Sequence, residues 1–142
     1  DLRPRSLHDE GIMDGIKRLV QEFRTNTLVE VNLQGPASGL ENLGRNQATA
    51  LFHICQEALA NIGRHAHAKR VDVILWVSND RLLMEIKDDG RGFDQSRIKM
   101  SIGHGLANIQ TRAKNAGGDV DIAAEPGKGT SVLTWVPLLL EE

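Results

Sequence analysis

Hydrophobic residues recur every three or four positions in the middle of the chain, and this spacing predicts a helix over about residues 45–65. Five of them would form an apolar stripe along the helix: Leu51, Ile54, Cys55, Ala58 and Ile62. Three polar residues at four-residue spacing would form a second row beside it: Glu57, Asn61 and His65. A carboxylate, a carboxamide and an imidazole in one row could bind a hydrated metal ion and its anion. Taken alone, the row is also typical of a solvated helix face.

The hydrophobic pattern also predicts the other helices and the strands. Helical spacing recurs over about residues 6–24, after a capping box at Ser6 and Asp9, and over residues 105–116. Alternating hydrophobic and polar residues predict five strands, at 28–33, 70–77, 81–87, 120–124 and 130–136. Short turns join the second strand to the third and the fourth to the fifth. This order predicts a two-layer α/β sandwich, with a mixed, mostly antiparallel sheet and three helices on one face.

Composition narrows the function without assigning it. The chain has 142 residues, 40% of them hydrophobic, which suits one domain over residues 1–142. A formal net charge of −2 gives no reason to expect direct binding to nucleic acid. No apolar run approaches the roughly 20 residues of a membrane-spanning helix. Cys55 has no partner for an internal disulfide, which favours a reducing, cytoplasmic location. Because the chain begins with Asp1 and not Met, we expect it to be part of a longer protein.

Three glycine-bearing segments could bind a ligand. DDGRGFD at residues 88–94 follows a strand, and its carboxylates could accept a hydrogen bond from an exocyclic amine such as that of adenine. GHGL at residues 103–106 opens a helix, where free N–H groups and the helix dipole favour an anion. GKGT at residues 127–130 begins a strand and could place Thr130 beside the base-binding carboxylate. Alone, DDGRGFD is equally typical of a turn, and GHGL of an ordinary loop before a helix.

Several other site motifs are missing from the sequence. No G-x-x-x-x-G-K-[ST] phosphate loop occurs, and no strand leads into a G-x-G-x-x-G dinucleotide fingerprint. The cysteine and histidines lack the spacing of a zinc site, and no Ser or Cys nucleophile motif is present. The polar row and the three glycine-bearing segments therefore remain as the candidate site.

In combination, these segments resemble the ATP-binding catalytic domain of sensor histidine kinases, in the superfamily that includes gyrase, the Hsp90 chaperones and MutL. QEALANIGRHA resembles the N box, DDGRGFD the G1 box, GHGLANIQTRAKNAGG the G2 box and its helix, and PGKGTSVLTWVPL the closing GT strand. RHA after Asn61, LRP near the start and the short lid resemble the nitrate and hexose-phosphate sensor subfamily. LRPRSLHDEGI looks closest to the hexose-phosphate branch.

The resemblance implies an ATP site that draws on all four boxes: Asn61, Arg64, His65, Asp88, Gly90, Gly92, Gly103, Gly105, Leu106 and Thr130. Asn61 and Glu57 would bind Mg²⁺, and these two residues with His65 would form the catalytic group. Asp88 would accept a hydrogen bond from the adenine amine, directly or with water and Thr130. The two glycines of DDGRGFD would let the base approach.

The phosphate end of the implied site involves the remaining residues. Arg64 and His65 would face the phosphates. Gly103 and Gly105 would frame a lid over residues 94–102, which has few apolar anchors and should order mainly when nucleotide is bound.

The resemblance also implies partners. LHDE around His8 superficially resembles a phosphoacceptor box, but the whole phrase LRPRSLHDEGI resembles the junction after the dimerisation helices. We therefore expect the acceptor histidine upstream of residue 1, with residues 1–8 as the junction. The implied partners are the protein's own dimerisation domain and a response regulator with a LuxR-type DNA-binding domain. The full-length protein would be a homodimer attached to the bacterial inner membrane, with this domain cytoplasmic, and the fragment alone a monomer.

Two alternative functions stay open. One is a serine kinase of the anti-sigma type on the same scaffold, although the LRP junction and RHA argue against it. The other is a degenerate domain that binds nucleotide or partners without turnover. The intact Asn61, Asp88 and glycine pairs argue against this second alternative.

Overall fold

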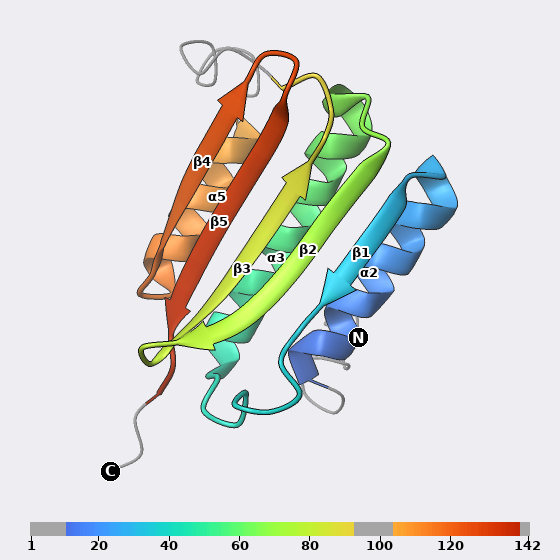
Figure 1. Ribbon diagram of the computed structural model, residues 1–142. Helices are drawn as coiled ribbons and strands as arrows, with labels where there is room; N and C mark the ends of the chain where they lie inside the picture. Colours follow the sequence, from blue (N-terminus) through green and yellow to red (C-terminus); the bar gives the residue numbers. More distant parts are fainter. Residues whose placement is uncertain (1–10, 93–103, 140–142) are drawn as a thin grey trace.

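The computed structural model describes residues 11–92 and 104–139, which form a two-layer α/β sandwich (Figure 1). Its helices are α2 (Gly11–Thr27), α3 (Arg45–Asn61) and α5 (His104–Asn115). Its strands are β1 (Glu30–Gln34), β2 (Arg70–Ser78), β3 (Arg81–Asp88), β4 (Asp119–Glu125) and β5 (Gly129–Pro137). These three helices lie behind one face of the sheet (Figure 1). The predicted fold class is therefore confirmed.

The sheet has the strand order β1-β2-β3-β5-β4. β1 pairs with β2 in parallel, because α3 carries the chain back between them, and the other pairs are antiparallel. The path of the chain brings the ends of several helices and strands to one edge of the sandwich, the upper edge in Figure 1. There β3 and β4 end, β5 begins, α3 ends and α5 begins. Segments far apart in the sequence thus meet at this edge.

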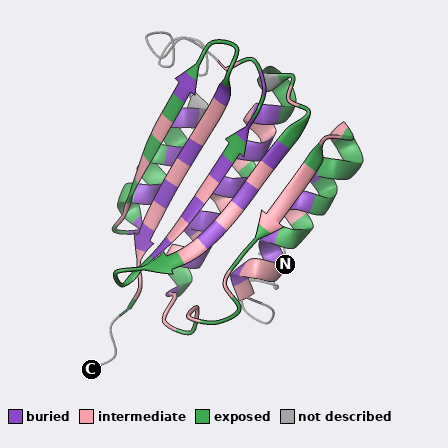
Figure 2. Ribbon diagram, viewed as in Figure 1, coloured by how far each residue is buried: buried purple, intermediate pink, exposed green. Residues whose placement is uncertain are grey.

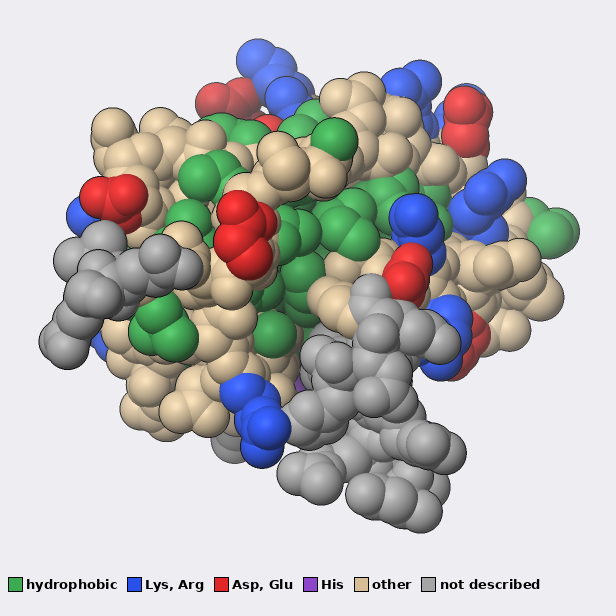
Figure 3. All heavy atoms as spheres, turned by 90° about the horizontal axis from the view of Figure 1, so that it is seen from below, with side chains coloured by type: hydrophobic (Ala, Val, Ile, Leu, Met, Phe, Trp, Pro, Cys, Tyr) green, Lys and Arg blue, Asp and Glu red, His purple; other side chains and the backbone are tan. Residues whose placement is uncertain are grey.

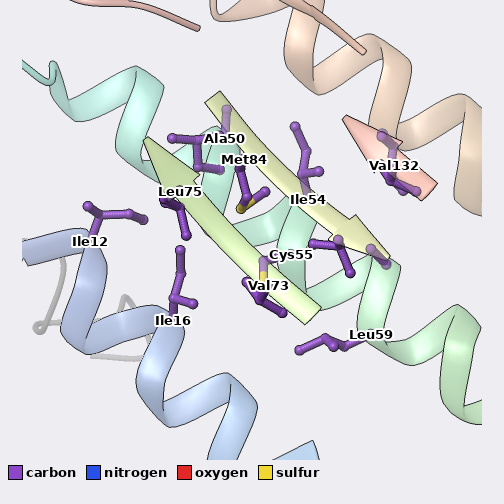
Figure 4. Packing of buried hydrophobic residues seen from close by; sticks show 14 of the residues in the cluster. Ile12, Ile16, Ala50, Ile54, Cys55, Leu59, Val73, Leu75, Met84 and Val132 are labelled. Atoms are coloured by element: carbon purple, nitrogen blue, oxygen red, sulfur yellow. The ribbon is translucent and has the colours of Figure 1, made fainter. Parts of the chain in front are cut away.

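The core lies between the helices and the sheet. Buried and half-buried residues alternate along β2 and β3, because successive side chains of a strand point to opposite faces (Figure 2). All five residues of the predicted apolar stripe are buried: Leu51, Ile54, Cys55 and Ala58 on α3, and Ile62 directly after it. Figure 4 shows side chains of α2, α3, β2 and β3 packed together in this layer. Burial raises the pKa of the Cys55 thiol to about 12, so this cysteine serves as a small core residue.

The lower end of the sandwich exposes hydrophobic side chains. At the lower end, hydrophobic side chains gather in the middle with charged side chains around them (Figure 3). Exposed large hydrophobic residues include Val77 at the end of β2 and Leu139 after β5. Within the described residues, no helix combines the length and the apolar character needed to cross a membrane.

Some element boundaries differ from the predicted ones. α2 continues to Thr27, and β1 begins at Glu30 and not at residue 28. Leu28 has a φ of 61°, and its N–H donates to the Arg24 carbonyl, which ends the helix with a left-handed residue. The predicted capping box at residues 6–9 and His8 lie outside the described residues.

Candidate functional site

A pocket opens at the upper edge of the sandwich, between the end of α3, the end of β3 and the start of α5. About 480 Å³ of space within it is free of protein atoms, and this volume includes space open to solvent. Its lining combines polar and apolar residues from α3 and the turn that follows it, β3, the loop after β3, α5 and β5: Ala58, Asn61, Ile62, His65, Ile86, Asp88, Gly92, Leu106, Thr130 and Val132. Six of these ten belong to the set predicted from the sequence.

Asp88 is the most deeply buried charged residue of the pocket. It is the last residue of β3 and is only 3% exposed, because its side chain points toward the helices as Ile86 does. Its Oδ1 accepts a hydrogen bond from the Gly90 N–H at 2.8 Å. Burial raises the pKa of Asp88, and the hydrogen bond from Gly90 offsets only part of that rise. Among the described residues, no Lys or Arg forms an ion pair with this carboxylate.

The neighbouring Asp89 has the opposite environment. It is exposed, and its Oδ1 accepts hydrogen bonds from the N–H groups of Lys69 at 2.9 Å and Arg70 at 3.0 Å. These bonds lower the pKa of Asp89 below its usual value. Asp89 therefore fixes the start of β2 to the end of β3, while Asp88 is left facing the pocket.

Gly92 packs the loop after β3 against the β4–β5 turn. Its φ is 62°, and a Cβ atom at this position would collide with the carbonyl oxygen of Glu125 and lie 2.9 Å from that of Gly129. The Gly127 N–H also donates to the Arg91 carbonyl. This close approach holds the start of β5 beside the end of β3, where Thr130 pairs with Asp88 in the sheet register.

The end of α3 is not a regular α-helix. After Asn61 the chain forms a π-helical turn, Ile62–Ala66, and the Ile62 N–H donates to the carbonyls of both Ala58 and Leu59. Such turns widen the helix by one residue and occur frequently at functional sites. The predicted continuation of an α-helix to residue 65 is therefore wrong in its last turn, although Asn61 and His65 both still line the pocket.

Arg64, in the π-helical turn, contacts two residues of the polar row. Arg64 Nη2 donates to Asn61 Oδ1 at 2.8 Å and lies 3.4 Å from Glu57 Oε2. Arg64 and Glu57 are absent from the pocket lining, and Arg64 instead borders a groove between α2 and α3. The two oxygens predicted to bind metal therefore converge on one cationic group, while the side chain predicted to face phosphates does not reach the pocket.

Arg91 was missed by the sequence analysis. Its Nε donates to the His65 carbonyl at 2.7 Å, so it ties the loop after β3 to the π-helical turn. An arginine between two glycines shows no pattern that would predict this contact. Among the predicted residues, Gly90 is buried but does not line the pocket, and Gly105 lies in the first turn of α5. Gly103 and the predicted lid lie outside the described residues.

Comparisons with known proteins identify the family. Residues 46–140 match the family described as histidine kinase-, DNA gyrase B-, and HSP90-like ATPase. The chain belongs to this family. The matched region contains the whole pocket, and the family predicted from the sequence is confirmed.

Relatives within this ATPase family are sensor histidine kinases. LiaS of Bacillus subtilis is 34% identical over 143 residues, which cover 99% of this chain and 38% of LiaS. VraS of Staphylococcus aureus is 33% identical, over 99% of this chain and 40% of VraS. DegS of Brevibacillus brevis is 32% identical, over 100% of this chain and 36% of DegS. The chain thus spans about two fifths of the length of these relatives.

Solved structures support the same fold for this ATPase domain. The histidine kinase domain of the blue-light activated histidine kinase from Erythrobacter litoralis EL346 superimposes with a TM-score of 0.73 at 20% identity. The superposition covers 87% of this chain and 59% of that domain. None of the relatives named here is described as a nitrate or hexose-phosphate sensor, so that narrower subfamily stays a prediction.

Proposed function

We propose that the pocket binds Mg-ATP and presents its γ-phosphate to a histidine on the dimerisation domain of the same protein, for relay to a response regulator. The observation that carries this proposal is the buried carboxylate of Asp88 at the end of an otherwise apolar strand face. The Gly90 N–H offsets only part of the cost of burying this carboxylate, so a ligand that donates a further hydrogen bond to it would be favoured.

The walls around Asp88 suit a purine base. Ile86, Val132 and Leu106 are buried apolar residues of the lining, from two strands and a helix, and they offer flat contact to an aromatic ring. Asp88 can then accept the exocyclic amine of adenine, with Thr130 beside it in the sheet. A base with a carbonyl in place of this amine would bring its oxygen against the carboxylate of Asp88. Two hydrogen-bond acceptors would then face each other, which disfavours such a base.

The donor set of the polar row fits Mg²⁺. Asn61 and Glu57 present a carboxamide and a carboxylate oxygen, the hard donors that Mg²⁺ prefers, and both already converge on the guanidinium of Arg64. Bound there, Mg²⁺ would offset the negative charge of the triphosphate. Asn61 and His65, which line the pocket, would hold and orient the phosphates, and Glu57, outside the lining, would support the metal.

Phosphate binding also draws on α5. The first turn of a helix carries N–H groups without helical partners, and its dipole favours an anion. α5 begins at His104, and Leu106 in that first turn lines the pocket. Gly103 and Gly105 would frame the phosphate loop and lid at this point. Catalysis then rests mainly on positioning and charge stabilisation. The base that activates the acceptor histidine would be an acidic residue beside that histidine, and Glu57 is the alternative base.

The family and its sensor kinase relatives support a proposal for the wider role. The chain would be one catalytic domain over residues 1–142, with residues 1–8 as the junction and His8 not the acceptor. The regulator would carry a LuxR-type DNA-binding domain, as in the nitrate and hexose-phosphate sensor branch. The full-length protein would be a homodimer at the bacterial inner membrane with this domain in the cytoplasm, and this chain alone would be a monomer.

Autophosphorylation of the full-length protein tests the proposal. With γ-labelled Mg-ATP, we expect label that is lost in acid and kept in alkali, as phosphohistidine is, and we expect Asn61→Ala to abolish it. Acid-stable label would indicate a serine kinase instead. Saturable ATP binding without any label would indicate a degenerate domain, and either result would overturn the proposed reaction.

A further inference from the structure

We propose that Arg64 is an internal counter-cation that covers the metal-binding oxygens of Glu57 and Asn61 until nucleotide phosphates attract it away. Metal binding to this site would then be weakened as long as nucleotide is absent. The inference rests on the proposed function, because it concerns the same metal ligands.

The contacts of Arg64 carry the inference. Its Nη2 lies 2.8 Å from Asn61 Oδ1 and 3.4 Å from Glu57 Oε2. An arginine nitrogen can only donate, so the Asn61 atom that it meets is the carbonyl oxygen, the same atom that a metal would use. A single nitrogen thus engages both oxygens at once, and a metal ion cannot approach Asn61 Oδ1 while Arg64 remains there.

Charge leads to the same conclusion. Glu57 and Arg64 form an ion pair, so the formal charges of this cluster cancel and it offers little attraction to a free divalent cation. Without Arg64 the cluster would carry the unit negative charge of Glu57. No other cluster of side chains would attract the metal instead, since groups of three or more His, Cys, Asp or Glu arranged to hold a metal are absent from the described residues.

The contact is also weak enough to be exchanged. The Arg64 side chain is 58% exposed and that of Glu57 is 29% exposed, and exposed ion pairs contribute only about 0–1 kcal/mol. A phosphate group is a stronger partner, because a guanidinium can donate two parallel hydrogen bonds to its oxygens. Arg64 follows Gly63 in the π-helical turn, one residue before His65 of the pocket lining.

Mn²⁺ binding to the nucleotide-free protein tests the inference. Mn²⁺ serves as a paramagnetic probe of the metal site, and the free ion is counted by its electron paramagnetic resonance signal. We expect Arg64→Gln to bind Mn²⁺ up to about fivefold more tightly than the wild type, the largest factor that an exposed ion pair can supply. Arg112→Gln, in the last turn of α5, removes the same charge far along another helix and should match the wild type.

Two further measurements make the result decisive. In Arg64→Gln/Asn61→Ala the added Mn²⁺ affinity should disappear, which assigns it to this cluster. Equal Mn²⁺ binding by wild type, Arg64→Gln and Arg112→Gln would overturn the inference. Because no nucleotide is present, this comparison can be read even if the wild type fails to bind ATP, a result that would instead count against the proposed function.

Discussion

The middle of the sandwich and its upper end use the same strand positions for different purposes. β3 directs Leu82, Met84, Ile86 and Asp88 toward the helices, and all four are buried. The first three are apolar, and Leu82 and Met84 are completely buried between the sheet and the helices. The fourth is a carboxylate that lines an open pocket. The geometry of the strand is unchanged along this row, and only the chemistry of its last residue differs.

The same contrast appears on β5 and α3. β5 directs Thr134 into the closed core and Thr130 toward the pocket, and α3 passes from its buried apolar stripe to Asn61 before its π-helical turn. If the proposed function holds, the core should determine stability and the upper end should determine binding. Substitutions in each region should therefore separate the two properties.

The largest effect is expected in the core. Met84→Ala should lower the free energy of unfolding by about 2–5 kcal/mol, because it removes a fully buried side chain and leaves a cavity. Urea denaturation measures the change. The fraction that remains folded should bind nucleotide with unchanged affinity. A parallel loss of affinity would contradict the separation of the two regions.

The next effect concerns the loop that closes the pocket. Gly92→Ala and Gly127→Ala both place a side chain at positive φ, 62° and 80°, which costs about 1–2 kcal/mol at either position. Only Gly92→Ala also meets the Glu125 carbonyl, since nothing lies within 4 Å of a Cβ at Gly127. We expect Gly92→Ala to lose more stability in urea denaturation and to weaken nucleotide binding. Equal losses for both variants would remove the packing role assigned to Gly92.

The sequence predicted the architecture well because hydrophobic periodicity records which side of each element is buried. The apolar stripe of α3 and the alternation along the strands were sufficient for the layers and the hairpins. The resemblance to the kinase family supplied most of the pocket residues. The contacts of Arg64, Asp89 and Arg91 could not be predicted, because each depends on backbone groups or a helix turn whose geometry no spacing encodes.

A smaller effect is expected at Thr134, whose hydroxyl is fully buried and has no hydrogen-bond partner among the described residues. Thr134→Val removes this unpaired polar group and should stabilise the protein by up to about 1 kcal/mol. Thermal unfolding provides the measurement. Destabilisation would show that the hydroxyl makes a favourable contact after all.

Substitution of the two adjacent aspartates, Asp88 and Asp89, should change the stability of the protein in opposite directions. The raised pKa of Asp88 means that the folded state binds more protons, so its contribution to stability falls as pH rises above the unfolded pKa. The lowered pKa of Asp89 gives a contribution that is present above the unfolded pKa and lost in acid. At neutral pH, Asp88→Asn should therefore stabilise the empty protein and Asp89→Asn should destabilise it. Chemical denaturation from pH 3 to pH 7 measures both, and shifts of equal sign would contradict the assignment.

Calorimetric titration of Mg-ADP and Mg-IDP tests the central claim most directly, with wild type, Asp88→Asn and the exposed control Asp121→Asn. The inosine nucleotide has a carbonyl where adenine has its amine. We predict that the wild type and Asp121→Asn prefer ADP, and that Asp88→Asn binds ADP about 10- to 100-fold more weakly, as expected for losing a hydrogen bond to a charged group. It should also lose the preference for ADP over IDP. Unchanged ADP affinity and preference in Asp88→Asn would show that this carboxylate does not bind the base.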